Sequence, residues 1–220
     1  MPPRTPPSTP TDVDASDDAS DDAVAAFWRW FASVADALGA ASPPPPLLEE
    51  LTARLQDDLG IPGWEIGPAL RTGARRLLAL SPEGDPELLP RTGAVIDAAP
   101  RLDGWELYAA RPPRPEAPLR FSMGDVDVDA NAWRFVCLVA PEPGADETGI
   151  VVEQPGLERL LADPDDRLAA AIICVDGLIG EGRRLEIFSE VYAAPSLHPH
   201  EAALARPIGE LPAALDEDVD

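Results

Sequence analysis

The chain contains no lysine, and all 17 of its basic residues are arginine. Without a lysine amine there is no Schiff-base nucleophile and no phosphate-binding lysine of a P-loop, which excludes pyridoxal-phosphate enzymes and P-loop NTPases. No other cofactor signature is present in the sequence, so we expect no cofactor. Replacement of lysine by arginine throughout a chain is typical of a GC-rich bacterial genome, and we expect a bacterial source.

Cysteine and histidine are scarce, with two residues of each. Cys137 and Cys174 lie in the apolar runs FVCLV and IICVD, where we expect them to pack as small hydrophobic residues rather than to form a secreted disulfide framework. No stretch approaches the ~18 apolar residues that span a bilayer. The first residues, MPPRTPPSTP, lack the apolar region of a signal peptide. We therefore predict a cytoplasmic protein without a membrane segment.

Basic residues are also few beside the 40 acidic ones, which gives a formal net charge of −23. Nucleic acids bind clustered lysine and arginine, so this charge argues against a nucleic-acid partner. An acidic membrane surface would repel the chain. A basic protein partner fits the charge, and so does solubility without any partner.

The two ends of the chain have few apolar residues, and we expect neither end to fold. Residues 1–22 are predicted to be a disordered acidic segment, and residues 201–220 are predicted to be a flexible acidic tail. The chain between them, 23–200, is predicted to be a single domain. It begins with two helices, which end at Gly39 and Gly60 and flank a run of four prolines.

From Gly63 onward the spacing of apolar residues becomes that of strands. Residues 63–110 are predicted to form strand, strand, helix and strand, and the same order returns in the second half, at about 119–195, after the proline-rich linker 111–118. The strands of the second half are predicted in WRFVCLVAPE, GIVVEQPG and RRLEIFSEVYAA. The sequence therefore predicts an α+β fold. Its mostly antiparallel sheet would be built from two such halves, with helices on one face and the two N-terminal helices packed against that layer.

The strongest candidate for a functional site is the turn after the predicted helix of the second half. Asp176 and Glu181 are carboxylates at a helix C-terminus, where the helix dipole disfavours negative charge, and such a local conflict can mark a site. The alternative is that Gly180 and Gly182 serve only to make the tight turn into the last strand.

Trp64, Trp105 and Trp133 open three of the predicted strands. Exposed rings would form a surface for a ligand or a partner. Buried rings would belong to the core, with each indole N–H hydrogen-bonded, and we favour this interpretation. Glu65 and Glu106 follow two of these tryptophans; they could act as an acid–base pair, but two solvated carboxylates on an outer sheet face are the simpler interpretation.

Two motifs have the residue types of metal sites. The triplet DVDVD at 125–129 has the opening spacing of a calcium loop, but Ala130 and Val136 stand where that loop requires glycine and glutamate. Its alternation is that of a strand with the carboxylates in water. His198 and His200 could supply two ligands, but no further histidine is available for a complete site. We predict a strand, a polar loop and no metal site.

Several short motifs follow one another in a definite order along the chain. They are FWRWF at 27–31, WEIGP at 64–68, SPEG at 81–84, ELLP at 87–90, APRLDGW at 99–105 and DGLIGE at 176–181. This ordered series resembles an uncharacterised bacterial protein family, and the resemblance covers about residues 24–195. The family has no established activity, ligand or catalytic residues, so the resemblance implies only that this stretch is one unit.

Three functions are compatible with these features. We favour a non-catalytic, acidic protein-interaction module, such as an inhibitor or immunity-type partner of a basic protein, because the charge is strongly negative and no catalytic constellation is evident. A hydrolase that uses carboxylates would bring Asp176 and Glu181, with Glu65 or Glu106, into one concave pocket with perturbed pKa values. A small-ligand sensor would line a cleft with its tryptophans. We therefore expect a protein that is not an enzyme.

Overall fold

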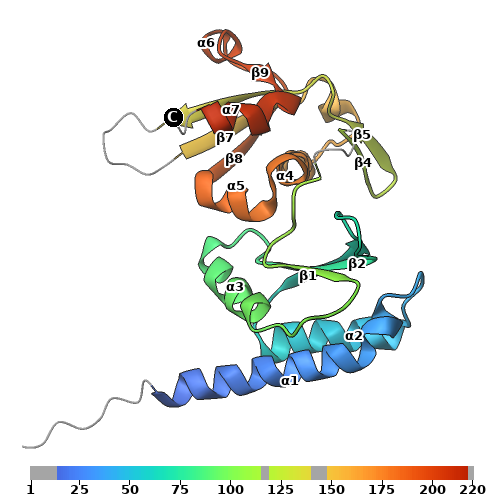
Figure 1. The fold of residues 1–220 in the computed structure, drawn as a ribbon. Helices are drawn as coiled ribbons and strands as arrows, with labels where there is room; N and C mark the ends of the chain where they lie inside the picture. Colours follow the sequence, from blue (N-terminus) through green and yellow to red (C-terminus); the bar gives the residue numbers. More distant parts are fainter. Residues whose placement is uncertain (1–13, 115–118, 140–147, 218–220) are drawn as a thin grey trace, which may run out of the picture.

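The computed structural model describes residues 14–114, 119–139 and 148–217 (Figure 1). Its helices, with short 3-10 or π-helical turns marked η, are α1 (Asp14–Leu38), α2 (Pro45–Ala53), η1 (Arg54–Asp58), η2 (Pro86–Leu88), α3 (Leu89–Asp97), η3 (Leu157–Arg159), α4 (Pro164–Ile179), α5 (Glu181–Ile187), α6 (Pro199–Ala202), η4 (Ile208–Glu210) and α7 (Leu211–Glu217). Its strands are β1 (Gly63–Pro68), β2 (Arg76–Ser81), β3 (Trp105–Tyr108), β4 (Arg120–Met123), β5 (Val126–Asp129), β6 (Arg134–Val139), β7 (Thr148–Glu153), β8 (Glu190–Ala194) and β9 (Arg206–Pro207). The chain is an α+β protein, as predicted.

The two halves have the same strand, strand, helix, strand order, which confirms the predicted repeat. In the first half β1 and β2 are antiparallel and β2 and β3 are parallel, with α3 in the crossover. In the second half β6 and β7 are antiparallel and β7 and β8 are parallel, with α4 and α5 in the crossover. Each half nevertheless has a sheet of its own, in the orders β1-β2-β3 and β8-β7-β6-β9, and the hairpin β4-β5 stands apart from both.

The first core lies between the N-terminal helices and one face of the first sheet. Apolar residues at three- and four-residue spacing on α1, among them Phe27 and Phe31, pack with Leu51 and Leu55 of the second helical segment and with Leu78 of β2. The two predicted N-terminal helices are therefore confirmed. Helix α1 begins at residue 14, inside the 1–22 segment predicted to be disordered, and residues 1–13 lie outside the described part of the chain.

The second core lies between α4, α7 and one face of the second sheet, and it corrects the prediction of a flexible tail at 201–220. Residues 206–217 form β9, η4 and α7, and Ile208, Leu211 and Leu215 are buried against Phe135 and the rest of this core. A few well-spaced apolar side chains are sufficient because the core already offers a surface to receive them. Residues 218–220 lie outside the described residues.

Residues 181–187 form helix α5, although residues 183–194 were predicted to be the last strand. The segment EGRRLEI consists mostly of good helix formers, and it buries Glu181, Arg184 and, directly after the helix, Phe188 along one side. The strand β8 begins only at residue 190. The apolar residues of this short segment fit the spacing of a strand as well as that of a helix. The charged residues Glu181 and Arg184 favour the helix, because it brings them to the partners described below.

The halves pack face to face rather than edge to edge. Strand β2 is buried on both faces: Leu78 and Leu80 face the first core, while Leu77, Ala79 and Ser81 alternate with them on the other side. Figure 1 shows α4 and α5 between the two sheets. The second face of β2 is also buried, and Glu181 of the second half contacts it at Ser81. The candidate site lies at this interface.

Candidate functional site

The turn between α4 and α5 is built around a glycine that no other residue could replace easily. Gly180 has a φ of 87°, which is strained for any residue with a Cβ. A Cβ at this position would also lie 2.9 Å from the ring of Pro113. The turn therefore lets the connecting segment 111–114 run directly against it. This turn leads into a helix rather than into the strand that we predicted.

The connecting segment 111–114 is bonded to this turn along its backbone. The N–H of Glu181 donates to the carbonyl of Arg111 at 2.9 Å, and the N–H of Arg114 donates to the carbonyl of Gly177 at 2.7 Å. Residues 111–118, RPPRPEAP, were predicted to be a proline-rich linker. The described part of that linker is instead an ordered strap across the interface; its remaining residues, 115–118, lie outside the described chain.

The carboxylate of Glu181 is only 1% exposed, and groups of the other half satisfy it. Its Oε1 accepts from the hydroxyl of Ser81 at 2.8 Å, and its Oε2 accepts from the backbone N–H of Arg111 at 3.1 Å. The guanidinium of Arg111 lies 4.0 Å from Oε1 and also binds Glu83 at 2.6 Å. Glu181 thus joins the end of β2, the connecting segment and α5.

Asp176 lies one turn before the end of α4 and is paired with an arginine of α5. Nε of Arg184 lies 2.5 Å from Oδ1 of Asp176, and both side chains are almost fully buried. Burial raises the pKa of Asp176 above its ordinary value, although the hydrogen bond from Arg184 acts in the opposite direction. Asp176 and Glu181, the two carboxylates that the sequence singled out, therefore do lie at one place.

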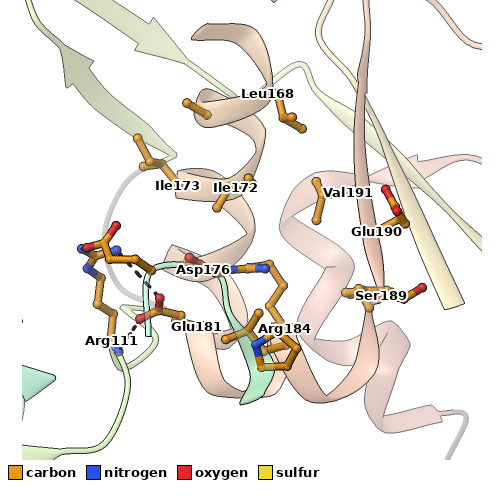
Figure 2. Close-up of a pocket in the computed structure, with 16 residues that line it drawn as sticks. Arg111, Leu168, Ile172, Ile173, Asp176, Glu181, Arg184, Ser189, Glu190 and Val191 are labelled. Atoms are coloured by element: carbon orange, nitrogen blue, oxygen red, sulfur yellow. Dashed lines mark hydrogen bonds and ion pairs between the residues drawn. The ribbon is translucent and has the colours of Figure 1, made fainter. Parts of the chain in front are cut away.

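These charged groups form the floor of a cleft of about 590 Å³, which we call the acidic cleft (Figure 2). One wall is apolar and comes from α4, α5 and β8. The lining contains four carboxylates against two guanidiniums, a formal excess of negative charge. The lining residues are Glu83, Gly84, Pro86, Arg111, Leu168, Ala169, Ile172, Ile173, Asp176, Glu181, Arg184, Leu185, Phe188, Ser189, Glu190 and Val191.

The three strand-start tryptophans lie in or against the cores and not around this cleft. The indole N–H of Trp64 donates to the hydroxyl of Thr52 at 3.1 Å. The ring of Trp105 packs edge to face on Phe31, and Trp133 is 2% exposed in the second core. This arrangement agrees with the core interpretation of these residues.

Glu65 and Glu106 do not form a pair, because they lie on β1 and β3, the two outer strands of their sheet. Glu65 is ion-paired with the guanidinium of Arg114. Glu106 accepts hydrogen bonds from the backbone N–H groups of residues 70–71 and from the hydroxyl of Tyr108. Burial acts to raise the pKa of Glu106, but these hydrogen bonds outweigh it and hold the pKa below its usual value. Glu106 does not line the acidic cleft.

The residues of the two metal-like motifs have other partners. Asp127 accepts from the hydroxyl of Ser122 across the β4-β5 hairpin, and Asp129 binds Arg120. The two histidines stack on each other at the start of α6. No group of three or more metal-ligating side chains with the geometry to hold an ion occurs within residues 14–114, 119–139 and 148–217.

Comparison with protein-family models, curated proteins and solved structures finds no match to this chain. Membership of the family that its ordered motifs resemble stays a prediction. Among the described helices, none combines the length and the apolar character needed to cross a membrane. Function is therefore inferred from the site itself.

Sequence reasoning missed four residues of the site: Ser81, Glu83, Arg111 and Arg184. Ser81 ends a strand that is buried on both faces, and Arg184 stands in a short segment between buried residues. A polar residue at the end of an otherwise apolar strand is a signal that could have identified Ser81. Nothing in the local sequence marks Arg111, whose role depends on the packing of the two halves.

Proposed function

We propose that this chain is a non-catalytic protein-interaction module and that the acidic cleft receives a basic segment of its partner. The observation that carries this proposal is the combination of an apolar wall with negative charge in one concave surface. Leu168 and Ile172 of α4 and Val191 of β8 lie along this wall (Figure 2). Such a surface favours a segment that inserts an apolar side chain and surrounds it with arginine or lysine.

The arginines of the cleft are already engaged, which leaves the negative charge in excess. Arg184 is bound to Asp176, and Arg111 is bound to Glu83 and lies near Glu181. Glu83 and Glu190 are the exposed carboxylates of the lining, and positive groups of a partner would meet these. The net charge of −23 on the chain would also accelerate the encounter with a basic protein. An inhibitor or immunity-type role fits a partner of this kind.

The backbone at the rim of the cleft gives further support. Glu83 has a φ of 50°, a left-handed conformation that is rare for a residue with a side chain. Its carboxyl group lies over Gly63, where a Cβ would collide with it. Backbone strain of this kind is found where a side chain must be held at a functional surface. Here the strain places a carboxylate at the entrance of the cleft.

The experiment is a quantitative pull-down in which the full chain is the bait and the charge of the cleft is reversed. Glu190 is exposed on β8 and lines the cleft, whereas Glu186 is exposed on α5 and does not. We expect Glu190→Arg to lose a stoichiometric basic partner that the wild type and Glu186→Arg retain, and we expect raised salt to weaken the wild-type complex. A partner retained equally by both variants, or no stoichiometric partner at all, would refute the proposal.

A carboxylate-dependent hydrolase is the second candidate, and one observation favours it. Asp176 has a raised pKa and shares a cleft with Glu181, as an acid–base pair would require. Against it, both carboxylates already have partners: Asp176 is bound by Arg184 of α5, and Glu181 is bound across the interface by Ser81 and Arg111. The test is turnover of chromogenic esters, glycosides and phosphate esters by the wild type and by Asp176→Asn. Absence of turnover by the wild type, or equal turnover by both proteins, would eliminate this candidate.

A further inference from the structure

A second cleft lies next to the acidic one, between the first sheet, the connecting segment 111–114, β4 and α4. Its volume is about 520 Å³, and we call it the arginine cleft. The two clefts share part of one wall. The lining residues of the arginine cleft are Glu65, Arg111, Pro112, Arg114, Leu119, Arg120, Phe121, Ile173, Cys174, Asp176, Gly177 and Leu178.

The charge of this cleft is opposite to that of its neighbour. Among the described residues, three arginines line it against two carboxylates, Glu65 and Asp176, in a chain whose net charge is −23. Arg111 is bound to Glu83 and Arg120 to Asp129, both outside the cleft, and Asp176 is bound to Arg184. Arg114 is paired with Glu65 inside the cleft, so it is the guanidinium that an entering anion could share.

Arg114 is the best placed of these arginines to bind a ligand. Its guanidinium is partly exposed and is bound through Nη2 to Glu65. A guanidinium has five N–H donors in a planar fork, so one carboxylate does not use its capacity. Its backbone N–H is fixed to the carbonyl of Gly177, which holds the start of the side chain at the edge of the cleft.

The rest of the cleft is apolar. Phe121, whose ring packs edge to face on Trp133 at 6.3 Å, lies on one side, and Ile173, Cys174 and Leu178 come from α4. Ile173 is 44% exposed, so its side chain is accessible to a ligand. Figure 2 shows Ile173 and Arg111 on the same side of α4. An apolar surface thus lies beside a cationic edge.

We propose that the arginine cleft binds an amphiphilic organic carboxylate, with the carboxylate on Arg114 and the apolar body against Phe121 and Ile173. A bidentate carboxylate–guanidinium pair matches the donor geometry of Arg114. In the free protein Glu65 occupies this donor. The ligand therefore competes with Glu65 for the guanidinium of Arg114. Removal of the Glu65 carboxylate should then strengthen binding of the ligand, an effect that purely apolar binding does not predict.

The test is titration of the full chain with decanoate, decanol and decylamine, measured by calorimetry. Decanoate should bind roughly tenfold or more tightly than the neutral and the cationic compound. Arg114→Gln should remove this preference, while Arg101→Gln, at an exposed arginine outside the cleft, should leave it unchanged. Glu65→Gln should increase decanoate affinity, because it removes the internal competitor.

Circular dichroism and urea unfolding establish that each variant is folded before its affinity is compared. If Arg114→Gln does not fold, Glu65→Gln tests the proposal through decanoate compared with decanol, since release of Arg114 should strengthen binding of the carboxylate and not of the alcohol. The proposal is overturned if decanol binds as well as decanoate, if folded Arg114→Gln keeps the wild-type preference, or if folded Glu65→Gln does not bind decanoate more tightly.

Discussion

Truncation of Glu181 is expected to weaken the connection between the two halves of the fold. Glu181→Ala removes the acceptor of the Ser81 hydroxyl and of the Arg111 backbone N–H. It also leaves the guanidinium of Arg111 without one of its two carboxylates. Removing one partner of a buried charged network costs about 3–5 kcal/mol. The guanidinium is partly exposed and keeps Glu83, so we expect the lower value, about 3 kcal/mol. Glu181→Gln keeps an acceptor for Ser81 but turns an amide donor toward the N–H of Arg111, and about 1–2 kcal/mol is expected.

Urea unfolding followed by two probes measures this effect. Four of the five tryptophans belong to or pack against the first core and Trp133 belongs to the second, so total tryptophan fluorescence reports mainly on the first half. Circular dichroism reports on both halves. The two transitions should coincide in the wild type and separate in Glu181→Ala. The matched control is Glu186→Ala at an exposed position of the same helix, expected to change stability by less than about 0.5 kcal/mol. If Glu181→Ala is as stable as this control, the interface does not depend on Glu181.

Three further predictions concern other buried groups. Arg184→Met alone should cost about 3–5 kcal/mol because it leaves Asp176 buried without its partner, whereas adding Asp176→Leu should recover most of this loss; equal urea stability of the single and double variants would contradict this. The hydrogen bond from Arg134 holds the pKa of Glu153 below its usual 4.5, so Glu153 stabilises the fold fully above that pH and loses this contribution as the pH falls through the lower folded-state pKa. Acid titration of the unfolding free energy should therefore be shallower in Glu153→Gln, and an unchanged slope would be evidence against the pairing. Burial raises the pKa of Cys174 to about 12; with the other cysteine changed to serine, its alkylation should be roughly tenfold or more slower in the native than in the urea-unfolded protein, and similar rates would show that the thiol is accessible.

The predictable part of the fold is the part determined by neighbours in sequence. The hairpin of β1 and β2, the crossover helices α3 and α4 and the N-terminal helices follow from local spacing of apolar residues and from turn glycines. The prediction failed where a short segment depends on distant packing. Leu211 and Leu215 are too few to indicate a stable helix, yet the second core buries them. Helix α5 was assigned to a strand because Leu185 and Ile187 alternate there as strand residues do.

The separation of the sheets could not be predicted from spacing, but one strand contained the relevant information. Leu77 and Leu78 are adjacent and both completely buried, so β2 must be covered on its two faces. A continuous apolar strand of this kind indicates a second packing layer, whereas an alternating strand indicates water on one side. The order of strands and helices along the chain does not distinguish one joined sheet from two stacked ones. The apolar content of the central strand does indicate a second layer, because a strand that is buried on both faces must be covered on both.

The candidate site illustrates a different limit, because its residues meet only after the halves have packed. Ser81 and Glu181 are 100 positions apart in sequence, and the segment that joins them to Arg111 resembles an unstructured linker. Sequence reasoning identified Asp176 and Glu181 because a helix end disfavours carboxylates. It could not identify Ser81 and Arg111, which compensate Glu181, since these come from the first half and from the connecting segment. The unfavourable position of these carboxylates at a helix end is therefore compensated by contacts made when the halves pack. The same interface creates the two clefts of opposite formal charge in which a ligand or a partner would bind.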